Sequence, residues 1–208
     1  MPVLNDDIPN PDHFNGDDGG DDSASNFDSL LDATNEPAGW LRDDELARVR
    51  GEVPIPYIAV MPVRVDDQNR VMQVGTLTRV TDGGDGRLTR TIIMGRIRFG
   101  ETIREALLRS VRHDLGDLAH PKLPVSLQPF SVAEFFPSPL APLHDARQHV
   151  IALCYVVPLA GSCTAADDAL DLEWTEPAKM EEAFFASMPD GQDRLLRAGL
   201  SWAGAWQV

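Results

Sequence analysis

The stretch that decides the fold reads GRIRFGETIREALLRSVRHDLG and spans Gly95–Gly116. Its fixed points are the two terminal glycines, Glu101 and Arg109. Thr102 and Glu105 have the spacing of a capping box, in which each side chain satisfies a backbone N–H group at the start of a helix. The stretch therefore predicts a loop followed by a helix that begins after Thr102.

Apolar residues recur at every third or fourth position after the capping box, which predicts a helix with one buried face. They are Ile103, Ala106, Leu107, Val111 and Leu115. Gly116 follows the last of them, at the place where helices commonly end in the left-handed conformation. The plainer alternative is an ordinary amphipathic helix between two glycines.

The spacing resembles the Nudix box, the loop–helix–loop that holds the catalytic metal of the Nudix hydrolases. The box normally continues after its arginine with three glutamates, and here those positions hold Ser110, His113 and Asp114. By this resemblance the chain is identified as a member of the Nudix hydrolase superfamily with a degenerate box. The resemblance implies an α/β fold, a Nudix-type α/β/α sandwich with a mixed sheet. Two of the three altered positions are expected to face a solvent-filled cleft.

Within that superfamily the chain is similar to the GDP-mannose mannosyl hydrolases and to an uncharacterised bacterial Nudix-like family. Three features support this similarity: WLRDDE at Trp40–Glu45 before a short helix, the missing acid directly after Arg109, and DLEWTEP at Asp171–Pro177. The last of these resembles the strand-to-helix passage that closes many Nudix domains.

The resemblance also implies a set of metal ligands. The Gly95 carbonyl, Asp114, His113 and Asp168 would hold a divalent cation, Mg²⁺ or Mn²⁺. Asp114 keeps the charge of the glutamate that it replaces. His113 suits Mn²⁺ better than Mg²⁺, because Mg²⁺ prefers oxygen ligands. Ser110 cannot replace a carboxylate as a strong ligand of Mg²⁺.

A catalytic histidine is the second expectation. The mannosyl hydrolases carry one shortly before the tryptophan of the closing strand, and Ala169 occupies that position here. His113 and His149 are the candidates to supply a general base in its place. The alternatives are that His113 is an exposed helical residue and that His149 is a locally bonded histidine at a strand end.

Arginines are expected to bind substrate and to hold the box together. Arg79, Arg96 and Arg98 are candidates for bidentate phosphate contacts. The resemblance assigns Glu101, Arg109 and Gly116 structural roles, with Arg109 paired to Glu101 or Glu105. Solvated strand faces would explain most other arginines equally well.

Charge divides the chain into two predicted parts. The net charge is −15, and residues 1–40 hold ten acidic residues with no Lys or Arg. We predict a disordered acidic tail at residues 1–38 and one Nudix-like domain at residues 39–208. Phe27–Ala33 is an apolar island in the tail, either a segment for a protein partner or incidental. The acidic charge argues against binding to nucleic acid or to an anionic membrane.

Two cysteines imply no disulfide framework. The sequence also contains no apolar run of transmembrane length and no secretory signal, so the expected location is the cytoplasm.

The remaining secondary structure follows from hydrophobic patterning. A helix is predicted at residues 40–50. Strands are predicted at residues 57–65, 71–79, 88–94, 125–135, 149–159 and 170–174. Helices at residues 178–186 and 191–206 end the chain.

The functional expectation is a metal-dependent hydrolase of a nucleoside diphosphate derivative, for example a nucleotide sugar. The alternative is a catalytically impaired Nudix-fold module that binds a nucleotide or a protein partner. Whether the altered box still catalyses is left open, and so is a homodimer.

Overall fold

The computed structural model describes residues 41–80 and 86–205, and the predicted tail at residues 1–38 lies outside them. The helices are α2 (Asp43–Glu52), α3 (Ile103–Leu115), α4 (Glu182–Ala186) and α5 (Gln192–Ala205), with the short 3-10 helices η1 (Asp117–Ala119) and η2 (Pro177–Lys179). The strands are β1 (Ile55–Val65), β2 (Val71–Val80), β3 (Leu88–Thr91), β4 (Ile93–Arg96), β5 (Ser131–Phe135), β6 (Val150–Pro158) and β7 (Asp171–Thr175).

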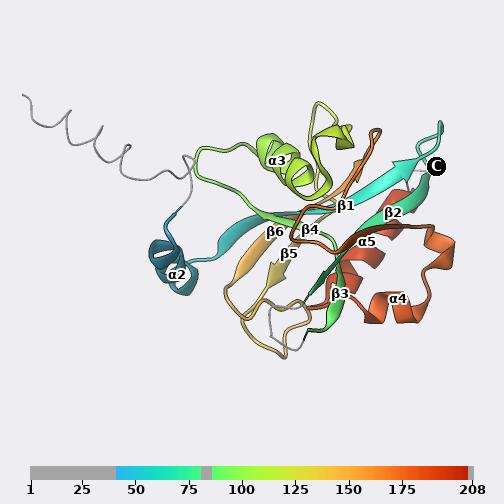
Figure 1. The fold of residues 1–208 in the computed structure, drawn as a ribbon. Helices are drawn as coiled ribbons and strands as arrows, with labels where there is room; N and C mark the ends of the chain where they lie inside the picture. The colour runs from blue at the N-terminus through green and yellow to red at the C-terminus, as the bar shows by residue number, and fades with distance from the viewer. Residues whose placement is uncertain (1–40, 81–85, 206–208) are drawn as a thin grey trace, which may run out of the picture. The chain divides into compact units, whose positions relative to one another are not determined.

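The strands form one mixed seven-stranded sheet in the order β3-β2-β1-β6-β5, with β4 paired to β1 and β7 paired to β2. β1 and β6 run parallel, with Ile55 opposite Val150. The other pairs between named strands are antiparallel. The predicted mixed sheet is thus confirmed, and β1 lies at its centre (Figure 1).

Helices cover both faces of this sheet (Figure 1). On β1, Ile58 and Val60 join the buried cluster that includes the apolar face of α3. Ala59 and Met61 alternate with them and join the cluster that includes residues of α4 and α5. Successive strand residues point to opposite faces, so β1 supplies both cores. The expected α/β/α sandwich with a mixed sheet is confirmed.

One predicted strand proves to be two. Residues 88–94 were expected to be continuous, but β3 pairs with β2 and β4 pairs with β1. The break falls at Ile92, whose N–H group donates to Gln192 Oε1 at 3.0 Å. A side chain from α5 therefore takes the place of a strand partner at this point. The turn of the chain delivers Gly95 to β1, opposite Ile58.

The strand predicted at residues 125–135 begins only at Ser131. Pro129 lies in the omitted part, and proline has no N–H group to donate to a neighbouring strand. The other predicted helices and strands of the described region are present with shifted ends. None of the helices that the structure describes has the length and apolar character needed to cross a bilayer.

Candidate functional site

The N-terminal end of α3 has the local structure that the sequence predicted, and the C-terminal end differs from the prediction in one dihedral angle. Thr102 Oγ1 accepts from the Glu105 N–H at 3.2 Å, and Glu105 Oε2 accepts from the Thr102 N–H at 2.8 Å. Gly116 ends the helix with φ 84° and ψ 165°. The positive φ is the expected one, but this ψ lies outside the left-handed helical region. Such a backbone conformation is open essentially to glycine alone.

Glu101 and Arg109 lock the loop before α3 onto the helix. Arg109 donates from Nε to Glu101 Oε1 at 2.6 Å and from Nη2 to Glu101 Oε2 at 2.8 Å. Nη2 also donates to the Arg96 carbonyl oxygen at 2.7 Å. The Arg98 N–H donates to Glu101 Oε2 at 2.9 Å. Arg109 therefore pairs with Glu101, while Glu105 is used in the capping box.

We expect Glu101→Gln to destabilise the protein by about 1.5–3 kcal/mol at neutral pH, as for hydrogen bonds to a charged group. Hydrogen bonds from Arg109 lower the pKa of the Glu101 carboxyl below its usual 4.5. A lowered pKa stabilises the fold above the unfolded pKa, and this stability is lost as pH falls through the folded pKa. The difference in the free energy of unfolding between Glu101→Gln and the natural protein, measured with urea, should therefore shrink as the pH falls below about 4.5.

The matched control for that experiment is Glu52→Gln. Glu52 pairs with Arg48 on the exposed side of α2, and exposed pairs contribute roughly 0–1 kcal/mol. An equal loss in both variants, or a Glu101→Gln effect that persists in acid, would contradict the role given to the Glu101–Arg109 pair.

Gly95 and Ser110 form the contact between β4 and α3. A Cβ atom at Gly95 would lie 2.2 Å from Ser110 Oγ, so the two elements approach too closely for a larger residue. Ser110 is only 4% exposed, and its Oγ has no hydrogen-bond partner among the described residues. The expectation that two of the altered box positions face an open cleft is wrong, because Ser110 and Asp114 are buried and only His113 is exposed.

Gly95→Ala should destabilise the protein by about 1–3 kcal/mol through overpacking. For a domain of this size, that corresponds to a fall of roughly 2–10 °C in the thermal midpoint. Adding Ser110→Gly removes the nearest side chain and should restore part of the loss. A double variant that is no more stable than Gly95→Ala would mean that Ser110 is not the obstacle.

Backbone hydrogen bonds bring the segment before β7 to the end of α3. The Ala166 N–H donates to the Asp114 carbonyl oxygen at 3.1 Å, and the Thr164 N–H donates to that of Leu115 at 3.1 Å. The Leu170 N–H then donates to the Thr78 carbonyl oxygen of β2 at 2.8 Å. These contacts place Asp168 between α3 and the end of β2.

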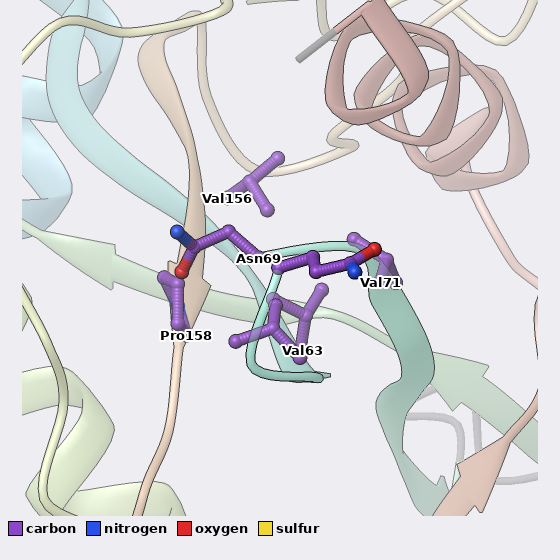
Figure 2. Close-up of a pocket in the computed structure, with 7 residues that line it drawn as sticks. Val63, Asn69, Val71, Val156 and Pro158 are labelled. Carbon is purple, nitrogen blue, oxygen red and sulfur yellow. The ribbon is translucent and has the colours of Figure 1, made fainter. Parts of the chain in front are cut away.

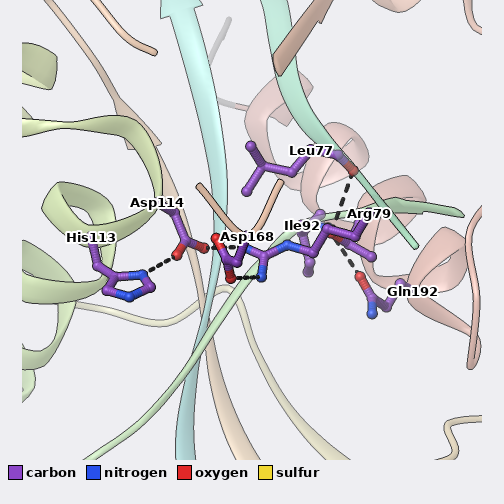
Figure 3. A network of polar contacts seen from close by, with 8 residues as sticks. Leu77, Arg79, Ile92, His113, Asp114, Asp168 and Gln192 are labelled. Carbon is purple, nitrogen blue, oxygen red and sulfur yellow. Dashed lines mark hydrogen bonds and ion pairs between the residues drawn. The ribbon is translucent and has the colours of Figure 1, made fainter. Parts of the chain in front are cut away.

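Arg79 of β2 joins the two aspartates that meet there (Figure 3). Its Nη2 lies 3.0 Å from Asp114 Oδ2, and its Nη1 lies 2.5 Å from Asp168 Oδ2. The side chain of Asp114 is 8% exposed, that of Arg79 27% and that of Asp168 49%. The structure therefore brings together two residues expected to bind metal and one expected to bind substrate.

His113 completes this group from the neighbouring position on α3. Its Nδ1 lies 2.7 Å from Asp114 Oδ1 (Figure 3). A carboxylate only accepts hydrogen bonds, so Nδ1 carries the proton and Nε2 is left as an acceptor when the ring is neutral. The His113 side chain is 66% exposed. Within residues 41–80 and 86–205, no three His, Cys, Asp or Glu side chains are grouped so as to hold a metal ion.

Arg96 and Arg98 lie beside the box helix. Burial lowers the pKa of both guanidinium groups, and repulsion from Arg109 contributes to each shift. Arg50 adds to the shift of Arg96. Several positively charged side chains therefore gather near the start of α3, and the negative charge of Glu101 lies among them. Such a cluster favours an anionic group nearby.

His149 lies in a different setting. Its ring stacks on Phe136 with centroids 4.5 Å apart, and its carbonyl oxygen accepts from the Ile55 N–H at 2.8 Å. In the described part of the chain, no recorded interaction joins it to Asp114 or Asp168. The structure thus groups His113, but not His149, with the two aspartates.

Sequence reasoning missed two polar contacts near the site. The first is the bond of Arg79 to both aspartates. The second is Gln148, which is 1% exposed, accepts from Arg50 Nε at 2.9 Å and donates to the Tyr57 hydroxyl at 3.0 Å. The partners in both are far apart along the chain, so no local pattern could have indicated them.

A separate cavity of about 260 Å³ lies near the turn between β1 and β2 (Figure 2). Its lining includes Val63, Asn69, Val71, Val156 and Pro158. No charged residue lines it, so it lacks the cationic side chains that bind phosphate most strongly. We therefore place the candidate site at Asp114 and Arg79.

Comparisons with known proteins show which family the chain resembles. The model of a domain of unknown function (DUF4916) matches residues 36–205. None of the curated proteins gives a match. A solved structure from Jonesia denitrificans, described as a possible asymmetric diadenosine tetraphosphate hydrolase, is 41% identical. It aligns with a TM-score of 0.71 over 74% of this chain and 96% of that chain.

Two more distant structures also align. A hydrolase of the Nudix family from Clostridium perfringens is 12% identical, with a TM-score of 0.48 over 74% of this chain and 98% of that chain. The Nudix domain of NrtR from Shewanella oneidensis, solved with ADP ribose, is 16% identical, with a TM-score of 0.49 over 79% of this chain and 99% of that chain.

Proposed function

We propose that this chain, which belongs to the family described as a domain of unknown function (DUF4916), is a Nudix-type hydrolase of a nucleoside diphosphate derivative. The observation that carries the proposal is the Glu101–Arg109 lock, which fixes the loop of the box against α3. The description of the relative from Jonesia denitrificans as a possible diadenosine tetraphosphate hydrolase supports the same reaction class. A nucleotide sugar, the narrower prediction, is one of the substrates in the test of this proposal.

Arg96 and Arg98 would bind the diphosphate. They lie where positive charges gather, and the Glu101–Arg109 lock holds their backbone in place. Guanidinium groups bind phosphate oxygens in pairs of parallel hydrogen bonds.

The donor atoms fit a divalent cation that arrives with the substrate better than a permanently bound one. Mg²⁺ is commonly held by one or two carboxylates together with substrate phosphates. Asp114 and Asp168 supply two carboxylates, and the Gly95 carbonyl and His113 are the other predicted ligands. Such an ion would offset phosphate charge and orient or activate water. A cation could bind these two carboxylates only in competition with Arg79, which contacts both of them.

His113 is the better of the two predicted bases. Asp114 holds the proton of its ring on Nδ1, so a neutral ring keeps Nε2 free to accept a proton from water. A carboxylate that orients a histidine in this way is a common arrangement in hydrolytic sites. The side chain is also exposed enough to meet a substrate.

The test is a hydrolysis assay with Mg²⁺ and with Mn²⁺ on diadenosine tetraphosphate, ADP-ribose and GDP-mannose. We expect turnover of at least one compound, and abolition of turnover by a chelator. Isotopically labelled water locates the bond that breaks. Label in the phosphate product indicates attack at phosphorus, whereas label in the sugar indicates attack at carbon. A chain that binds these compounds and releases no product would overturn the proposal.

The alternative function is a Nudix-fold module that binds a nucleotide or a protein partner with impaired catalysis. The observation that favours it is Arg79, which already neutralises the two predicted metal-binding carboxylates. Calorimetry separates the two functions, because a binding module takes up nucleotide in the presence of a chelator and leaves it intact.

A further inference from the structure

Arg79 occupies the position that a cation would take between Asp114 and Asp168. Each of its two terminal nitrogens contacts the Oδ2 atom of one aspartate, at 3.0 Å and 2.5 Å. The partners come from β2, the end of α3 and the segment before β7 (Figure 3). Arg79 therefore links the two acids.

The need for such a link follows from burial. The side chain of Asp114 is 8% exposed, and a buried carboxylate is costly unless it is paired and hydrogen-bonded. His113 bonds the other oxygen, Oδ1, and a neutral imidazole would leave the charge uncompensated. Arg79 supplies the positive charge, and it does so through the oxygen that faces Asp168.

We infer that Arg79 is an internal counter-ion that competes with a divalent cation for Asp114 and Asp168. A guanidinium group and a metal ion held at the same two oxygen atoms would repel each other, so the two cations compete for the aspartates. Binding of a divalent ion is therefore expected to weaken or displace the contacts of Arg79. This inference rests on the proposed function only in placing the ion at these two aspartates.

The competition gives the substrate a second role. A diphosphate is a bidentate acceptor for arginine, so a metal–diphosphate complex brings both a cation for the aspartates and a new partner for Arg79. The free protein is then expected to bind divalent ions weakly, with Arg79 setting the limit. The Arg79 side chain is 27% exposed, so part of it already reaches solvent.

The experiment is a titration of the full chain with Mn²⁺ alone. Binding is measured by calorimetry and, independently, by the electron paramagnetic resonance signal of free Mn²⁺. Arg79→Gln should bind Mn²⁺ at least about tenfold more tightly than the natural protein, because the neutral side chain no longer competes. Arg79→Lys should be intermediate, since lysine keeps a point charge but cannot bridge both carboxylates. The double variant Arg79→Gln, Asp114→Asn should lose the gain.

Arg70→Gln is the matched control. Arg70 is an arginine that pairs with Asp66 near the start of β2, and its removal should leave Mn²⁺ affinity unchanged. If Arg79→Gln binds Mn²⁺ no better than the natural protein, the inference is wrong, whatever the hydrolysis assay shows. Conversely, a tenfold gain together with no turnover of any compound would support the inference and count against hydrolysis.

Thermal unfolding with and without Mn²⁺ tests the inference even if a variant is less stable than the natural protein. Without metal, Arg79→Gln leaves Asp114 uncompensated and should lower the thermal midpoint. Mn²⁺ at about 100 times its Kd should raise that midpoint by roughly 5–10 °C, since it binds only the folded chain. If Arg79→Gln does not fold in either condition, Arg79→Lys decides the matter, and a lysine variant without any gain in Mn²⁺ affinity overturns the inference.

Discussion

Replacing Ser110 with glutamate should destabilise the protein by about 3–5 kcal/mol, although it restores an acid to the box. Ser110 is 4% exposed, and its Oγ already lies 2.2 Å from the place of a Cβ atom on Gly95. A glutamate would put a larger side chain and an unpaired charge into that contact, and uncompensated buried charges cost about this much. Urea unfolding of the two proteins measures the difference.

His113→Glu is the matched control, because it restores an acid at an exposed position of the same helix. Its effect on stability should be smaller, at about 1–2 kcal/mol, because it removes the hydrogen bond to Asp114 and adds one repulsive charge but leaves the new side chain in solvent. If both variants lost the same stability, the burial of Ser110 would not be the cause. If Ser110→Glu were as stable as the natural protein, the contact between β4 and α3 would have to be able to open.

The local features of the box were predictable because their partners are close in the chain. The capping box joins residues three apart, Thr102 and Glu105. The lock joins residues eight apart, Glu101 and Arg109. The apolar face of α3 follows from helical periodicity alone. At this range, residue type and spacing fix the geometry, and the resemblance that implied the fold class rests on the same stretch.

The site could be predicted less well, because its decisive contacts are long-range. Arg79 lies 35 positions from Asp114 and 89 from Asp168. The bond from Ile92 to Gln192, which divides one predicted strand into two, joins residues 100 apart. No spacing rule relates such residues. The sequence could name Arg79 as a phosphate ligand, but only the fold places it against the two aspartates.

Burial was the other quantity that the sequence left open. The residues Ser110, His113 and Asp114 lie within about one helical turn, and two of the three were expected to face a cleft. A rotation of about 100° per residue separates them, so Ser110 and Asp114 face the interior while His113 faces solvent. Two polar residues therefore lie on the buried side of an amphipathic helix, a break in the pattern that is typical of functional sites.

Asp114→Asn should reduce hydrolysis by at least about 100-fold while the protein stays folded. Asp114 is the only acid among the three altered box positions, and it contacts both Arg79 and His113. Asparagine keeps its shape but removes the charge that would hold a cation and that orients the proposed base. The loss of a metal contact is worth several kcal/mol of transition-state stabilisation, and about 2.7 kcal/mol corresponds to 100-fold. Arg79 keeps its bond to Asp168, so the buried site is not left with an unpaired cation.

The control variant is Asp117→Asn, at a position three residues after Asp114. Asp117 also pairs with an arginine, Arg112, but its side chain is 82% exposed. Its removal should leave the rate of hydrolysis within about twofold, because an exposed ion pair that touches no part of the site contributes little. Initial rates with saturating Mn²⁺ and substrate measure both variants, and circular dichroism checks their folding. Equal rates for Asp114→Asn and the natural protein would remove Asp114 from the reaction. The Arg79–Asp114 pair would then be a structural contact, and the search for the reacting groups would move to the arginines at the start of α3.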